Sequence, residues 1–79
     1  AADGKTYYLQ VGAFRVLEDA ESLRAKMLLL GLPVQIQRAE VKGVLVNRVR
    51  VGPYSKLDDM NAAREKLAAQ KITANVIRQ

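Results

Sequence analysis

One pattern occurs twice in this sequence, at a fixed offset of 40 residues. Residues 11–27 and residues 51–67 align without a gap, and six of the seventeen aligned pairs are identical. Architectures built from repeats of this length need about three or more units to bury a continuous core. Two units in a chain of 79 residues therefore predict a single domain with internal pseudo-twofold symmetry, in which each unit supplies half of one core.

Each unit begins with a strand pattern and continues with a helix pattern. Residues 6–14, TYYLQVGAF, alternate and are rich in aromatic and β-branched side chains, which favours a strand. From Leu17 onward, apolar residues recur at spacings of three and four, as they do along one stripe of a helix. Residues 45–54 and a stripe that begins at Leu57 repeat this order, with Ser55 as the candidate N-cap of the second helix.

Two further strands complete the predicted sheet. Residues 33–41 and 44–52 flank a Lys-Gly pair, which is typical of a tight hairpin turn. Residues 72–77 alternate again and form the last strand. Gly12 and Gly52 stand where a strand passes into a helix, so we expect a β-bulge or a close approach of helix to sheet at each of them.

The order strand-helix-strand-strand-helix-strand predicts an α+β fold, the ferredoxin-like βαββαβ sandwich. Right-handed crossovers place both helices on one face of a four-stranded antiparallel sheet, with the strands of the two units central and adjacent. Residues 1–5 are expected to be a disordered or linker segment, and residues 6–79 the folded domain. The other face of the sheet has no covering layer, so it is the candidate binding surface.

The composition excludes most kinds of catalytic site. The chain has no cysteine and no histidine, so it lacks thiolate chemistry, the commonest metal ligand and the commonest general base. Its acidic residues stand mostly at the predicted helix starts, where they complement the helix dipole. The sequence contains no glycine-rich phosphate loop and no metal-ligand spacing, so we expect a domain that is not an enzyme and that needs no cofactor or metal ion.

Strand alternation assigns a mostly polar set of side chains to the uncovered face. The set includes two arginines, amides and some apolar side chains but no lysine, which favours a binding face over a merely solvated surface. The net charge of +5 suggests an anionic partner, but we interpret most of these charges, those on the predicted helices in particular, as solvated surface. Alternation also turns Gly12 outward. The outward set is Tyr8, Gln10, Gln35, Gln37, Val46, Arg48, Arg50, Asn75 and Ile77.

Nucleic-acid binding is the alternative function, because the RNA recognition motif has the same strand order. That module stacks bases on aromatic side chains of its two central strands. Here the third strand, LVNRVRV, has no aromatic residue, and the first strand offers only Tyr8 on its outer side. An RNA-recognition-like domain is therefore the second hypothesis, and we expect no nucleic-acid partner.

The two motifs of the repeat resemble a known family. YYLQVGAF at residues 7–14, NRVRVGPY at residues 47–54 and ANVIR at residues 74–78 are similar to the SPOR domain, a peptidoglycan-binding module of bacterial division and wall-processing proteins. The resemblance covers about residues 6–78. It implies non-enzymatic binding of peptidoglycan glycan strands that lack stem peptides and accumulate at the division septum. It thereby implies that the domain targets its host protein to the septum.

The resemblance also implies which residues bind the glycan. Its binding positions fall in the first motif, in the hairpin and in the last strand, and they correspond to Gln10, Ala13, Val46, Asn47, Arg48 and Ile77. Strand alternation adds Tyr8 and Arg50 to this predicted site. We expect a monomer in the periplasm or cell envelope, attached to a membrane only through an anchor outside this sequence.

Overall fold

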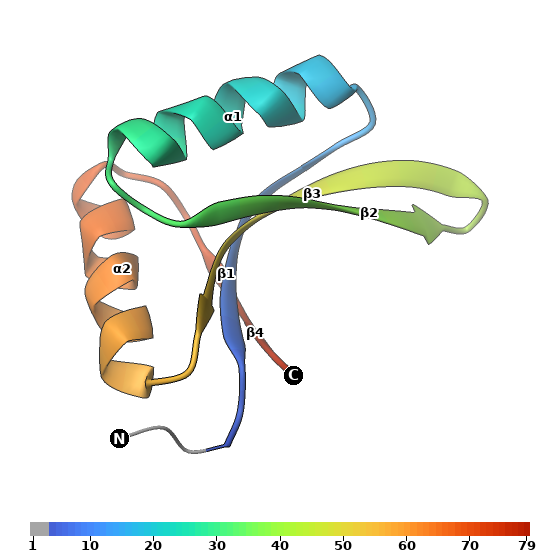
Figure 1. The fold of residues 1–79 in the computed structure, drawn as a ribbon. Coiled ribbons are helices and arrows are strands. Elements are labelled where there is room, and N and C mark those ends of the chain that lie inside the picture. The colour runs from blue at the N-terminus through green and yellow to red at the C-terminus, as the bar shows by residue number, and fades with distance from the viewer. Residues whose placement is uncertain (1–3) are drawn as a thin grey trace.

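A computed structural model describes residues 4–79 as a four-stranded antiparallel sheet with two helices packed on one face (Figure 1). The strand order across the sheet is β2-β3-β1-β4, so the strands of the two repeats are central and adjacent, and the predicted α+β sandwich is confirmed. Of the linker expected at residues 1–5, residues 1–3 lie outside the described part of the chain. The elements are β1 (Tyr7–Phe14), α1 (Leu17–Leu29), β2 (Val34–Val41), β3 (Val44–Tyr54), α2 (Leu57–Ala69) and β4 (Asn75–Arg78).

The hydrophobic core lies between the sheet and both helices. Leu9 and Val51 face each other across the two central strands, and both are fully buried. Met27 and Leu67, which are partners at the offset of 40, are fully buried as well. Burying a side chain of this size contributes about 1.5–3 kcal/mol. Each repeat therefore supplies matching side chains to one shared core, as the repeat predicts.

A β-bulge interrupts β3 at the glycine of the second repeat. Val51 lies opposite Leu9 and Tyr54 lies opposite Tyr7. Between these two pairs, β3 therefore contains one residue more than β1. Gly52 has a φ of 131°, which side chains with a Cβ rarely adopt, and a Cβ there would lie 2.9 Å from the carbonyl oxygen of Tyr7. The expected bulge at this glycine is confirmed, and it requires the absence of a side chain.

A glycine ends α1, whereas no side chain caps the start of α2. Gly31 has a φ of 78°, and the following N–H, that of Leu32, donates to the carbonyl of Met27. The prediction that Ser55 caps α2 is wrong. The chain is still extended at Lys56, which is the N-cap residue and makes no side-chain capping hydrogen bond. Acidic residues in the first turn complement the helix dipole instead.

The β2-β3 hairpin extends past the rest of the sheet. Both turn residues have positive φ, 52° at Lys42 and 80° at Gly43, as a type I′ turn requires, so the predicted hairpin is confirmed. The last residue of β1 pairs with Asn47, whereas β2 stays paired with β3 as far as Val44. Beyond Asn47 the hairpin is therefore a two-stranded ribbon, which curves away on the right of Figure 1.

Candidate functional site

The sheet face opposite the helices is called the open face from here on. The strand register shows that every position assigned outward by alternation lies on this face, apart from Gly12. One row of side chains crosses all four strands and consists of Asn75, Gln10, Arg50 and Gln35. The open face comprises Tyr8, Gln10, Ala13, Gln35, Gln37, Ala39, Val46, Arg48, Arg50, Asn75 and Ile77.

A bulge in β1 explains how Gln10 and Ala13 share the open face although they are three residues apart. Gln10 lies opposite Arg50, but Val49, the residue before Arg50 in β3, lies opposite Gly12, so Val11 is the extra residue of β1. The alternation reverses at this point, and the outward assignment of Gly12 is wrong. A Cβ on Gly12 would lie 2.8 Å from Cδ2 of Leu23 in α1, so this glycine faces the helix and lets it approach. Ala13 is turned to the open face and is exposed.

Arg50 is the centre of a hydrogen-bonded network on the open face. Its Nε donates to Oε1 of Gln10 at 3.0 Å, and its Nη1 donates to Oε1 of Gln37, also at 3.0 Å. Nε2 of Gln37 donates in turn to Oε1 of Gln35 at 3.3 Å. Arg50 is only 8% exposed. The guanidinium is thus held by neutral amide oxygens, and its positive charge is not neutralised by these contacts.

Arg48 is the second cation of the open face and, unlike Arg50, is not held by hydrogen bonds to described side chains. It lies between Ala13 and Gln37, is partly exposed, and makes no hydrogen bond or ion pair to another described residue. None of the open-face residues is acidic. The face therefore combines one fixed and one unengaged guanidinium, an arrangement suited to a ligand that carries carboxylate or phosphate groups.

Apolar pairs flank the polar centre at both ends. Tyr8 lies opposite Ile77 at the β4 side, and Val46 lies opposite Ala39 where the ribbon begins. All four side chains are partly buried. They offer flat apolar contact on either side of the guanidiniums and amides, as a ligand with both polar groups and C–H surfaces requires.

Asn47 is the one predicted site residue that the structure does not place on the open face. It lies opposite Phe14 on the helix side of the sheet and is 4% exposed. Its Nδ2 donates to the backbone carbonyls of Phe14 at 3.1 Å and Arg15 at 3.4 Å, while its Oδ1 accepts from Nε of Arg38. Asn47 therefore fastens the end of β1 and the start of the connection to α1, and it is inaccessible to a ligand on the open face.

Gln35, Gln37 and Asn75 were placed outward by alternation but were not included among the predicted binding residues. Gln37 contacts Arg50 directly, and Gln35 supports Gln37. The predicted hairpin is the signal that points to the two glutamines. It pairs β2 with β3, so the outward residues of β2 must lie beside the two arginines of β3.

Two surface cavities lie away from the open face. One, of about 360 Å³, is lined by the loop after α1 and by α2 residues, and the other, of about 350 Å³, by the end of α2 and the loop that follows it. Burial raises the pKa of Tyr54, in the first cavity, above its ordinary value of 10.0, and the Asp59 carboxylate adds to the increase. Within residues 4–79, no acidic cluster could hold a metal ion, and neither helix is long and apolar enough to cross a membrane.

Comparisons with known proteins agree with this architecture. The sequence model of the SPOR domain family matches residues 3–78. The crystal structure of the RlpA SPOR domain from Pseudomonas aeruginosa is similar with a TM-score of 0.80 and 31% identity, covering 92% of this chain and 99% of that one. No match is found among curated proteins.

A second solved structure shows the same fold. It is the solution structure of the peptidoglycan binding domain of the B. subtilis cell wall lytic enzyme CwlC, with a TM-score of 0.77 and 24% identity. The similarity covers 100% of this chain and 95% of that one.

Proposed function

The chain belongs to the SPOR domain family, and we propose that its open face binds the glycan strands of peptidoglycan, with a preference for strands from which the stem peptides have been removed. Besides membership of this family, one observation supports the proposed glycan binding. The open face presents two guanidiniums among amides and has no acidic residue. The domain acts by binding and performs no chemistry on the glycan.

The chemistry of a stripped strand matches the centre of the open face. Removing a stem peptide frees the lactyl carboxylate of the muramic acid unit, whereas in an intact strand an amide bond consumes that carboxylate. Arg48 has no partner among the described residues, which supports a role as donor to such a carboxylate. A strand with its peptides loses this charge-assisted pairing and also carries bulk at the same position, so the preference for stripped strands follows from both effects.

The remaining polar side chains suit the neutral parts of the glycan. Asn75 and the amide groups of Gln35 and Gln37 can donate to and accept from sugar hydroxyl and acetamido groups. Tyr8 and Ile77 at one end, and Val46 at the other, can cover sugar C–H surfaces. Arg50 acts as a positioning residue, because its hydrogen bonds to Gln10 and Gln37 fix the orientation of both amides.

The preference for stripped strands gives the domain a targeting role. Strands without stem peptides accumulate where amidases cut the dividing wall, so a host protein that carries the domain collects at the division septum. Such a role implies that the domain works on the cell-wall side of the membrane, in the periplasm or cell envelope. We expect it to bind the strand as a monomer.

A sedimentation assay with purified wall sacculi tests this function. The protein is mixed with sacculi before and after amidase treatment, and the bound fraction is measured. We expect stronger retention on treated sacculi, and a loss of roughly tenfold in affinity for Arg48→Ala, because a hydrogen bond to a charged group contributes about 1.5–3 kcal/mol. Lys42→Ala, which removes the same charge at the hairpin tip, is the matched control and retains binding.

Two results would reject the proposal. Equal retention on both sacculus preparations would remove the preference for stripped strands. Tight binding to single-stranded RNA with a steep dependence on salt, together with no retention on sacculi, would instead assign the open face to nucleic acid.

A further inference from the structure

The C-terminal ends of α1 and α2 meet at one corner of the helix layer, on the left of Figure 1. We define the helix corner as residues 26–33 and 66–73, which contain the last turn of each helix and the loop after it. The two segments are neighbours, because a Cβ on Gly31 would lie 3.6 Å from Nζ of Lys66. The corner is therefore one surface to which both repeats contribute.

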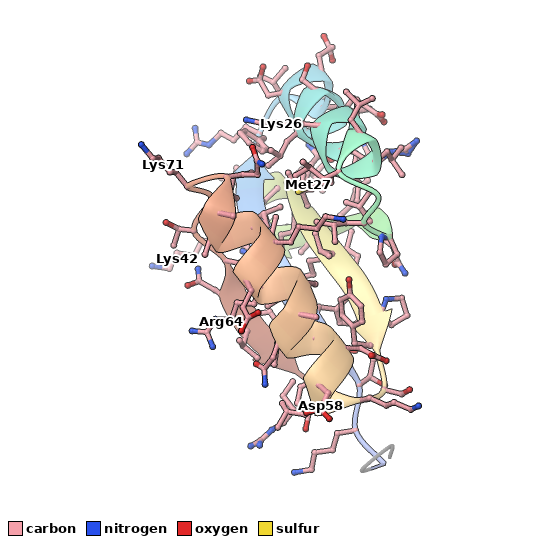
Figure 2. All side chains as sticks on the ribbon, turned by 90° about the vertical axis from the view of Figure 1, so that its left-hand side faces the viewer. Lys26, Met27, Lys42, Asp58, Arg64 and Lys71 are labelled. Atoms are coloured by element: carbon pink, nitrogen blue, oxygen red, sulfur yellow. The ribbon has the colours of Figure 1, made fainter. Side chains whose placement is uncertain are left out.

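The helix corner carries positive charge alone. Lys26, Lys66 and Lys71 are all exposed, and neither segment contains an acidic residue. The acidic pairs stand in the first turns of the helices, and Figure 2 shows Asp58 at the opposite end of α2 from Lys71. Lysines in a last helical turn complement the helix dipole, but Lys71 lies in the loop after α2. Dipole complementation thus does not account for the whole charge of the corner.

Two leucines add an apolar element to this basic corner. Leu29 is 88% exposed and Leu28 is 53% exposed, and neither belongs to the core or to the side chains packed against it. Their partners at the offset of 40 are Ala68 and Ala69. The helix of the second repeat therefore ends in small side chains, and the packing of the domain does not require leucine at these positions.

We propose that the helix corner docks on an anionic lipid surface, with Leu28 and Leu29 at the boundary between headgroups and acyl chains and the lysines facing the phosphates. Peripheral binding of this kind combines shallow apolar burial with attraction between basic side chains and anionic headgroups. A second copy of the chain is a poorer occupant, because two such corners would bring like charges together. The open face lies on the other side of the sheet, so it stays accessible while the corner is docked.

Vesicle co-sedimentation of the 79-residue chain tests this proposal. The vesicles are phosphatidylcholine alone, or phosphatidylcholine mixed with phosphatidylglycerol in a three-to-one ratio. Binding is expected to the anionic vesicles only. Lys71→Gln should lower the partition coefficient about fivefold, as removal of one basic residue near such a surface does. Leu28→Ala combined with Leu29→Ala should lower it by roughly tenfold or more through lost apolar burial.

Matched controls separate the corner from the rest of the molecule. Lys42→Gln removes the same charge from a residue that also has positive φ, at the far end of the hairpin, and Leu45→Ala truncates a leucine that is 57% exposed on the ribbon. Both controls should bind like the wild type, and so should Arg48→Gln on the open face.

Three outcomes would overturn the proposal. The first is equal binding to both kinds of vesicle. The second is a loss with Lys42→Gln or Arg48→Gln as large as the loss with Lys71→Gln. The third is a dimer in vesicle-free sedimentation that dissociates when Leu28 and Leu29 are truncated, since it would assign the corner to a second copy.

Discussion

Within the sheet, the strands of the two repeats agree in character where they face the core and differ where they face outward. Val11 and Val51 are identical, and Met27 and Leu67 are both fully buried. On the open face, by contrast, the repeat pairs are Tyr8 with Arg48 and Gln10 with Arg50. Side chains at core positions of both repeats must fill the same close-packed interior. Outward positions are free of it, so the difference between the repeats marks where a ligand without twofold symmetry would be recognised.

The pair Gln10 and Arg50 shows this most clearly, because the two residues are repeat partners and also direct neighbours across β1 and β3. The pseudo-twofold axis therefore passes between them. A symmetric pair would place two amides or two guanidiniums there. The amide and guanidinium instead form a hydrogen bond of 3.0 Å, so the asymmetry of the open face begins at the axis itself.

Substitution of the two bulge glycines, Gly12 and Gly52, has the largest expected effect on stability. It tests whether the two repeats impose the same constraint on the backbone. Gly52→Ala should destabilise the fold by about 3 kcal/mol, because its φ of 131° is strained for alanine and the new Cβ would meet the carbonyl of Tyr7. Gly12→Ala should cost about 1–2 kcal/mol, because the Cβ would meet the movable side chains of Leu23 and Phe14. Chemical denaturation measures both. Equal losses would show that the two bulges impose the same backbone constraint.

A smaller effect separates two open-face residues by their roles. Gln10→Ala should lower the free energy of unfolding by about 1–2 kcal/mol, because it removes the acceptor of Arg50, which is 8% exposed. Arg48→Ala should change it by less than about 0.5 kcal/mol, since Arg48 has no partner among the described residues. Thermal unfolding of both variants checks this. If Arg48→Ala proved the more damaging change, Arg48 would be part of the scaffold.

The smallest expected effect on stability concerns Tyr54, whose partner in the first repeat is Phe14. The pKa of Tyr54 is raised in the folded state, mainly by burial. Its contribution to stability is therefore complete below the unfolded-state pKa and is lost as the pH rises through the folded-state pKa. Tyr54→Phe, which copies the residue of the first repeat, should make the alkaline loss of stability shallower. Denaturation at neutral pH and above pH 10.0 measures how steeply the free energy of unfolding falls with pH. An unchanged slope in Tyr54→Phe would contradict a raised pKa of Tyr54 in the folded state.

Most of the fold could be predicted from the sequence, because the repeat and the alternation of the strands report directly on the core. The alternation that turns Gln10 and Arg50 outward turns their chain neighbours Leu9 and Val51 inward, where both are fully buried. The hairpin turn followed from glycine at a position that needs positive φ. These features depend on neighbours in the chain or on simple periodicity, and both are visible in the sequence.

The details of the site were harder to predict, because they depend on register. A bulge at Val11 reverses the alternation, so periodicity assigns Gly12 to the wrong face, and only the family resemblance draws attention to Ala13. The near burial of Arg50 results from amides on two other strands. Asn47 satisfies backbone carbonyls more than thirty residues away, a contact that periodicity does not reveal.

An exchange of repeat partners tests the central claim most directly. The double variant Tyr8→Arg with Arg48→Tyr swaps two open-face residues across the pseudo-twofold axis and leaves composition and net charge unchanged. Its affinity for amidase-treated sacculi is measured by sedimentation alongside its thermal midpoint. We predict a loss of affinity of roughly tenfold with a nearly unchanged midpoint, because the guanidinium moves away from the position where we propose that it binds the lactyl carboxylate. Wild-type affinity in this variant would contradict the account, since it would mean that the positions of these residues on the open face do not matter.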